Sequence, residues 1–376
     1  MTRRRERGIG TLATCAVMLM VLALGAAWAA RQMTTAQRVA ANDHRAALAF
    51  EAAESGLAWA VAMLNGGAID AACRPAVVGT ATSAAATMAT TQAPTKLGGS
   101  TALDFRTRFL SIGTDGHYRA PASTDAPPPP TCWNTDALRW TCRCSSGSQG
   151  NDDASPAGGA PRPRFSVRFI DGGAPGQLKL IASGCSDQRP HCDDLTDGPS
   201  GVAETSQHLA LLSALRLPPA SARVEGPGSF LQVFGYPPAH YRNQPAIARL
   251  RCDGECAGPL AQALARGRRL VWIDGDARLS RWPDEALDGT PWILVVDGLL
   301  TLSAPGHPQG VLYARDGIHW HPAAGTAASL RGALVTDGVI DRARSVELIH
   351  DRAVLHQLHR RMGSFLPVPG GWTPTR

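Results

Sequence analysis

The sequence lacks several features that mark common classes of protein. It has only two lysines, Lys96 and Lys179, so arginine carries nearly all of its positive charge. Outside an N-terminal arginine cluster it contains no basic run, so the net charge of +6 does not indicate a nucleic-acid surface. It also lacks a nucleophile elbow, a phosphate-binding glycine loop and a zinc-protease motif. We therefore expect a protein that is not an enzyme, without a cofactor or a bound metal.

Proline is also absent between Ile9 and Leu64, which allows one uninterrupted helix over this range. Its first part, Ile9–Ala30, carries no charge and as a helix measures about 33 Å, enough to cross a hydrocarbon core of about 30 Å. The arginines that precede it place the N-terminus in the cytoplasm and the bulk of the chain across the membrane. These arginines are Arg3, Arg4, Arg5 and Arg7.

The polar part of this helix has a broken apolar stripe suited to packing on a globular domain. The stripe consists of Val39, Leu48, Leu57, Val61 and Leu64. The alternatives are a plain stalk helix behind an anchor, or a cleavable secretory signal ending at Ala27-Trp28-Ala29. The apolar run is longer than the roughly 7–15 residues of such signals, which disfavours the second alternative.

Two segments, one just before this helix and one within it, resemble a known family. Arg5-Glu6-Arg7-Gly8 before the apolar run resembles the leader of type IV prepilins, and Ala49–Leu57 resembles the segment after the membrane span of PilX-type minor pilins. The resemblance implies that prepilin peptidase cuts after Gly8 and leaves Ile9 as the mature N-terminus. It also implies a single-pass inner-membrane protein with a periplasmic bulk, incorporated in a pilus, whose partners are other pilins, the inner-membrane assembly machinery and the bilayer.

In the segment Ala49–Leu57, the resemblance implies a role in assembly for Phe50, Glu51 and Glu54. Glu54 either pairs with a basic residue of a neighbouring subunit or faces water. The fifth residue of the implied mature chain is Ala13, where major pilins usually have glutamate. PilX-type pilins and K-type pseudopilins of type II secretion often lack that glutamate, so the resemblance points to a minor subunit.

Cysteine usage agrees with an extracytoplasmic location. Cys15 lies in the apolar run, and the eight others form an even set that predicts up to four disulfides. Spacing favours Cys185 with Cys192 and Cys252 with Cys256, while Cys142 and Cys144 pair with Cys132 and Cys73 in an order left open. The alternative is a zinc site at the Cys142-Cys144 or Cys252-Cys256 spacing, although the spacings do not match each other.

The middle of the chain predicts a small antiparallel sheet between long loops. Trp140–Cys144, Phe165–Ile170 and Gln177–Ile181 have the pattern of strands, and this region resembles the middle of PilX-like proteins. The loops are expected at 80–94, 120–130 and 145–163, because those stretches are rich in Ala/Thr, in Pro, or in Gly, Ser, Pro and Asp. Ala203–Leu217 is compatible with a connecting helix.

The C-terminal third contains an internal repeat in which a hydrophobic strand ends in Asp-Gly. The copies are Asp274-Gly275, Asp297-Gly298, Asp316-Gly317 and Asp337-Gly338. Asp-Gly favours a tight turn with positive φ, and a period near 20 residues fits the stacked coils of a parallel β-solenoid. Two hairpins of a sandwich are the alternative. Arg352–Arg361 has helical spacing and is expected to cap one end of the stack.

Several side chains of this third are candidates for catalysis or metal binding. The four aspartates could form an acid/base array, but turn formation explains each of them. His319 and His321 alternate along a strand without a third ligand, and His356 and His359 are expected on a solvated helix face.

The sequence therefore predicts an α+β protein with four parts: a cytoplasmic leader at 1–8, a pilin-like helix at 9–64 with its transmembrane half at 9–30, a disulfide-bonded β region at 65–200, and a solenoid-like domain at 201–376. The function it predicts is that of a non-enzymatic minor pilin-like subunit of type IV pilus assembly. The alternatives are a K-type pseudopilin and a membrane-tethered or secreted β-solenoid that binds or cleaves carbohydrate.

Overall fold

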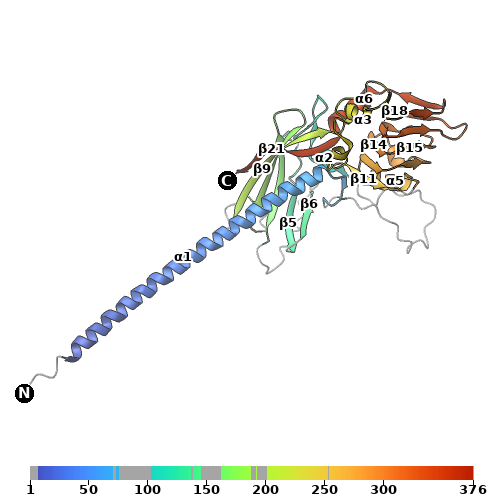
Figure 1. The fold of residues 1–376 in the computed structure, drawn as a ribbon. Helices are drawn as coiled ribbons and strands as arrows, with labels where there is room; N and C mark the ends of the chain where they lie inside the picture. The colour runs from blue at the N-terminus through green and yellow to red at the C-terminus, as the bar shows by residue number, and fades with distance from the viewer. Residues whose placement is uncertain are drawn as a thin grey trace, which may run out of the picture.

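The structure is a computed structural model with a long helix, an antiparallel sheet and a stack of parallel strands (Figure 1). It describes residues 7–70, 73–75, 103–122, 124, 126–136, 139–144, 162–187, 192, 201–252 and 254–375. The predicted loop at 80–94 and most of that at 145–163 lie outside the described residues. The fold is a mixture of helix and sheet, which confirms the α+β prediction.

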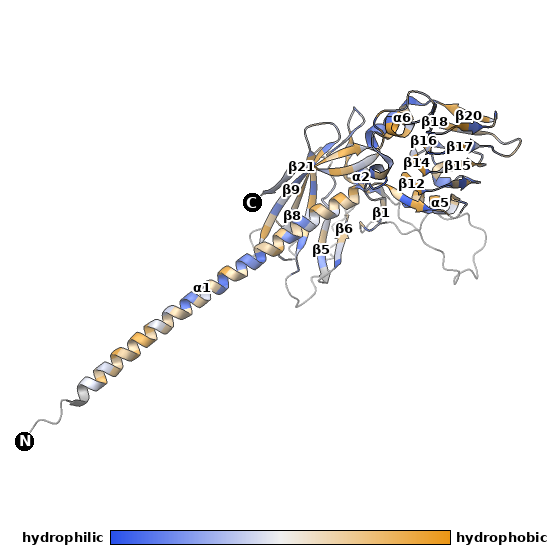
Figure 2. Cartoon of the chain, viewed as in Figure 1, coloured by the Kyte–Doolittle hydropathy of each residue, from blue (hydrophilic) through white to orange (hydrophobic). Residues whose placement is uncertain are grey.

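Helix α1, Arg7–Leu64, is a single helix of 58 residues, as the absence of proline predicts. Residues 10–44 are exposed and extend beyond the rest of the molecule. We call them the free part of α1, which is about 50 Å long. The first half of α1 is apolar, and the middle of α1 is more polar (Figure 2). Within the part of the chain that the structure describes, α1 is the helix that is long and apolar enough to cross a membrane.

The last turns of α1 pack on a six-stranded antiparallel sheet (Figure 1). Its strand order is β21-β9-β8-β7-β5-β6. The strands are β5 Thr131–Asp136, β6 Arg139–Arg143, β7 Arg164–Asp171, β8 Gln177–Cys185, β9 Val202–Ser213 and β21 Gly363–Thr375. The three predicted strands thus fall in β6, β7 and β8.

The helix predicted at 203–217 is wrong, because Val202–Ser213 is strand β9. This strand pairs with β8 on one side and β21 on the other, so hydrogen bonding across two ladders outweighs the helical propensity of its Ala and Leu residues. The predicted boundary at residue 200 also lies between two paired strands. Strands β9 and β21 complete the antiparallel sheet, and residues 214–362 are inserted between them.

The inserted segment contains stacked parallel coils, as the repeat predicts. Each coil is a strand, a short corner and a second strand: β12 Leu270–Asp274 with β13 Ala277–Leu279, β14 Trp292–Asp297 with β15 Leu299–Leu302, β16 Gln309–Ala314 with β17 Gly317–Trp320, and β18 Ala328–Thr336 with β19 Ile340–Arg342. All pairings between successive coils are parallel, which excludes the hairpin alternative.

Further strands extend the larger parallel sheet at its two edges. Strand β11, Ala248–Arg251, pairs with β12, whereas β10, Arg223–Glu225, and β20, Val346–Ile349, both pair with β18. Short elements complete the described structure: β1 Ala68–Ile69, β2 Leu103–Asp104, α2 Phe105–Phe109, β3 Ser111–Ile112, β4 Tyr118–Arg119, α5 Ala257–Ala265 and η1 Asp284–Ala286.

The larger parallel sheet is buried on both faces. One face, with Ile273, Val296 and Leu312, packs across the coil interior against the smaller sheet. Inside the coils the Trp282 ring lies 5.9 Å from Trp292 and 6.0 Å from Trp320, measured between ring centroids. Because both faces exclude water, its strands are continuous hydrophobic runs rather than alternating ones.

The outer face of that sheet is covered by helices α3 Ser229–Phe234, α4 Pro238–Tyr241 and α6 Arg352–Arg361. The predicted helix at 352–361 is therefore present, but Val354, Leu355 and Leu358 pack on the sheet face rather than across the end of the stack. Helix α5 lies at the β11 end of the stack (Figure 1), and its Leu260 and Leu264 are buried in the coil core. The cap at this end of the stack is therefore α5.

The Asp-Gly repeat forms the corners of the coils for two different reasons. Gly275 and Gly317 have φ values of +83° and +134°, as a turn with positive φ predicts. Gly298 and Gly338 do not have positive φ, and the expectation is wrong there. A Cβ at Gly338 would lie 2.7 Å from the Asp316 carbonyl oxygen, so close stacking of successive coils requires these two glycines.

Gly310 gives a sharp test of coil stacking. It has φ +146°, and a Cβ would lie 1.8 Å from the Trp292 carbonyl oxygen on the neighbouring coil. We expect Gly310→Ala to lower the free energy of unfolding by about 3 kcal/mol, because backbone must move. Gly325→Ala is the control: its φ is +81°, but nothing lies within 4 Å, and a loss of about 1 kcal/mol is expected. Equal urea midpoints for the two variants would contradict the stacking argument.

Candidate functional site

The contact between α1 and the antiparallel sheet is built from small residues. Buried helix positions there are Ala49, Ala52, Ala53, Gly56 and Ala60. Opposite them, a Cβ at Gly184 of β8 would lie 2.1 Å from the Ala49 carbonyl oxygen. The helix and strand backbones therefore approach too closely for any side chain at Gly184. We call this contact the helix–sheet seam.

The predicted apolar stripe coincides with the seam only near its end. Leu57 and Leu64 are buried, but Val39 is 59% exposed because the sheet does not extend that far along the helix. Larger side chains enter from both sides: Leu57 from the helix, and Phe165 and Leu180 from the sheet. The sequence pattern of large apolar residues missed the seam because alanine and glycine mediate it.

The three residues of the predicted assembly motif are not among the buried residues of the seam. Phe50 is 40% exposed, and Glu51 is exposed. Glu54 accepts a hydrogen bond of 2.9 Å from the indole Nε1 of Trp372 in β21. Its partner within the chain is thus an edge strand of the sheet, which neither alternative for Glu54 foresaw.

The C-terminal end of α1 is held by one buried arginine. Arg106 in α2 donates from Nε to the Leu64 carbonyl at 2.5 Å, from Nη2 to the Gly363 carbonyl at 2.7 Å and from Nη1 to the Arg361 carbonyl at 3.2 Å. Its guanidinium also lies 4.9 Å from the centre of the Phe365 ring. A single side chain thus joins α1, the end of α6 and the start of β21. We call this the arginine junction.

Burial lowers the pKa of the Arg106 guanidinium, with Tyr118 and Asp104 acting in the opposite direction. An arginine side chain is not deprotonated in proteins, so the group stays charged. Burial likewise raises the pKa of the Asp104 carboxyl, opposed by the charge of Arg106. The carbonyl dipoles around Arg106 replace the water that its charge loses on burial.

Asn65 and Arg268 extend this junction to the solenoid. The Asn65 side chain exchanges two hydrogen bonds of 2.8 Å with the backbone of Phe365, in the manner of a strand neighbour. Arg268, just before β12, donates to the Asn65 carbonyl at 2.7 Å and to the Ile247 carbonyl at 3.1 Å. The end of the helix is therefore fixed to both the sheet and the stacked coils.

The eight cysteines outside the apolar run stand in four pairs at disulfide distance. They are Cys73–Cys144, Cys132–Cys142, Cys185–Cys192 and Cys252–Cys256. The order left open by the sequence is thus resolved: Cys132 and Cys142 face each other on β5 and β6, which leaves Cys144 for Cys73. The four cysteines of the zinc alternative, Cys142, Cys144, Cys252 and Cys256, all belong to these pairs.

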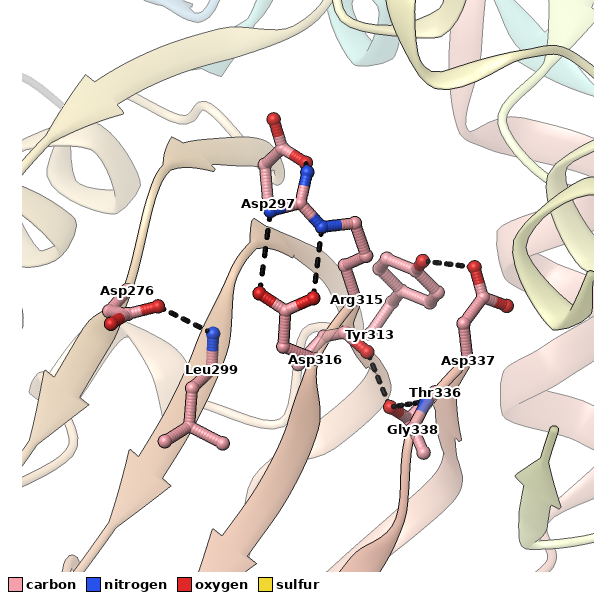
Figure 3. A network of polar contacts seen from close by, with 10 residues as sticks. Asp276, Asp297, Leu299, Tyr313, Arg315, Asp316, Thr336, Asp337 and Gly338 are labelled. Carbon is pink, nitrogen blue, oxygen red and sulfur yellow. Dashed lines mark hydrogen bonds and ion pairs between the residues drawn. The ribbon is translucent and has the colours of Figure 1, made fainter. Parts of the chain in front are cut away.

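The repeat aspartates lie at the corners of the coils, and each has a partner; Figure 3 shows those of Asp297, Asp316 and Asp337. Asp274 accepts from Arg249, while Arg315 lies between Asp297, at 2.7 Å, and Asp316, at 3.1 Å. Asp337 accepts from the hydroxyl of Tyr313 at 2.9 Å and from the backbone nitrogen of Phe230 in α3 at 3.1 Å. These carboxylates therefore tie coils and helix together.

The pKa of Tyr313 is raised, first by burial and then by its hydrogen bond to Asp337. Tyr313 therefore remains protonated and can keep donating that bond at physiological pH.

The histidines are spread over separate surfaces. His319 and His321 are exposed on the outer side of the smaller sheet, and His321 lies 3.0 Å from Asp341. His356 is exposed on α6, as expected. His359 differs, because its Nδ1 lies 2.8 Å from the Leu215 carbonyl oxygen after β9 and so takes part in internal packing.

Gly8 and Ile9, the predicted cleavage site, lie in the first turn of α1. Residues 7–58 match the family model described as PilX N-terminal. The resemblance read from the sequence is confirmed for this helix. The match covers the free part of α1 and most of the seam, and it covers neither the antiparallel sheet nor the solenoid. No curated protein and no solved structure matches the chain.

The arginine junction yields a stability prediction. Arg106→Met should lower the free energy of unfolding by about 3 kcal/mol, because three buried carbonyls lose their donor. Arg106→Lys should recover only part of this loss, since an ammonium cannot satisfy the same planar arrangement. The measurement is urea unfolding of the detergent-solubilised full chain, followed by tryptophan fluorescence. Arg344→Met, at an exposed position, is the matched control and should change little.

Proposed function

We propose that the chain is a non-enzymatic minor pilin-like subunit that anchors in the inner membrane and takes part in type IV pilus assembly. The observation that carries this proposal is the division of α1 into an exposed apolar part and a part fixed by the helix–sheet seam, over residues that match the PilX N-terminal model. Such a helix serves as a membrane anchor and as a packing element at once.

Transfer from membrane to filament follows from the chemistry of the free part. In the bilayer, the side chains of residues 10–30 contact lipid, and in a bundle of like helices they contact other apolar side chains. The exchange exposes no apolar surface to water. The seam keeps residues 49–64 packed on the sheet throughout, so the subunit moves as one body.

The orientation proposed is an N-terminus in the cytoplasm and a periplasmic bulk. Its support is the arginine cluster before the apolar run, together with four cysteine pairs at disulfide distance after it. Partners on this proposal are prepilin peptidase, other pilins that pack against the free part of α1, and the assembly machinery of the inner membrane.

Leader processing provides the first test. With prepilin peptidase co-expressed, the intact mass of the extracted protein should fall by the mass of Met1–Gly8, and without the peptidase it should not. Gly8→Leu should prevent the loss, whereas Gly10→Leu, two residues on in the same free helix, should leave processing intact. Peptidase-independent cleavage near Ala29 would instead indicate a secretory signal and overturn the proposal.

Assembly provides the second test. In the source organism, deletion of the gene should reduce surface pili and twitching motility by about tenfold, and the wild-type chain but not Gly8→Leu should restore them. Pili counted by electron microscopy give the readout. Normal pili with impaired protein secretion would assign the chain to a secretion pseudopilus, the K-type alternative, and normal pili with normal secretion would contradict both.

A further inference from the structure

An open groove lies where α1 ends against the solenoid. Its volume is about 450 Å³, and its walls are mostly apolar. Ala62 and Met63 of α1 and Ile69 of β1 form one wall, while Leu250 of β11 and Ala263 of α5 form the other. The groove is distinct from the free part of α1, and neither the PilX N-terminal match nor the proposed function assigns a role to it.

Strand β11 beside the groove is the edge of the larger parallel sheet. Among the described strands, the order ends at β11, which pairs with β12 on one side only. Among the described residues, no backbone hydrogen bond reaches residues 248–251 from the other side. A free strand edge offers unpaired N–H and C=O groups at regular spacing, and an extended peptide satisfies them by adding a strand.

The charge around the groove selects the kind of peptide. Three arginines line it, Arg249, Arg266 and Arg268, and no acidic residue is among the described residues that line it. Asp274 compensates Arg249, at 3.0 Å, and Arg268 donates to backbone carbonyls. Arg266 is exposed and has no ion pair with a described residue. A carboxylate on an incoming segment would therefore find an uncompensated partner in Arg266.

We propose that this groove binds an extended acidic segment of a partner protein, which adds as a strand to β11. Apolar side chains of the segment enter the groove between α1 and α5, and its carboxylates face Arg266 and the neighbouring arginines. Alternation of the two kinds of side chain follows from the period of two of a β-strand. The site joins the helix end to the solenoid, so a bound segment contacts both.

The test uses the detergent-solubilised full chain and a fluorescent heptapeptide of alternating Glu and Val. Fluorescence anisotropy should show saturable binding of this probe, and the Lys-Val peptide should bind at least about tenfold more weakly, because the arginines repel it. Raising the salt concentration should weaken binding of the Glu-Val probe.

Two variants locate the binding. Ala62→Trp places an indole in the groove from an exposed helix position, and Ala58→Trp, exposed one turn earlier and outside the groove, is its control. Arg266→Glu reverses the charge, and Arg281→Glu, exposed elsewhere on the solenoid, makes the same change in net charge. Each groove variant should raise the Kd about tenfold, while each control should change it less than twofold.

Circular dichroism and urea midpoints like those of the wild type establish that the groove variants fold. Failure of the wild-type chain to bind the Glu-Val probe would overturn the proposal, as would equal binding of the Lys-Val peptide or equal effects of groove and control variants. A change in oligomer mass on Ala62→Trp without probe binding would assign the groove to a second copy of the chain, against the proposal.

Discussion

The arrangement of the sheet and the solenoid depends on the hydrogen bonds that the last carbonyl groups of α1 accept. The last turn of a helix leaves carbonyl oxygens without partners, and here that turn is buried between a sheet and a solenoid. Arg106 donates one hydrogen bond to the Leu64 carbonyl, and Arg268 donates one to the Asn65 carbonyl. Because Arg106 also bonds to Arg361 and Gly363, the same charge that completes the helix fixes the place where the chain returns from the solenoid.

This return explains how a large insertion is compatible with an intact antiparallel sheet. Strands β9 and β21 are separated by residues 214–362, yet they pair along most of their length. Pairing strands so distant in sequence costs loop-closure entropy, and that cost is offset only if the insertion folds and holds its ends together. The solenoid core, the helices on its outer face and the arginine junction meet this requirement, since the start and the end of the insertion both lie beside β9.

Several elements could be predicted because their signals are local. The proline-free helix, the strands of β6 to β8, the coil repeat and two cysteine pairs follow from spacing and composition alone. Strand β9 was mistaken for a helix because its sequence, rich in Ala and Leu, reveals neither of its two distant partners. Arg106 and Trp372 gave no signal, since their partners lie far away along the chain: Leu64 and Gly363 for the first, Glu54 for the second. The small residues of the seam were invisible for another reason, because a search for large apolar side chains passes over Ala and Gly.

The seam and the junction together attach α1 to the body at two places. The backbones of Ala49 and Gly184 are in close contact along the helix, and Arg106 holds the helix end at the last turn. The direction of the free part is therefore set by the sheet, and the direction of the coil stack is set by the same helix end. A bundle of helices that contains residues 10–44 would therefore also set the positions of the solenoid and of the groove beside β11. Both are connected to the bundle through the same helix end.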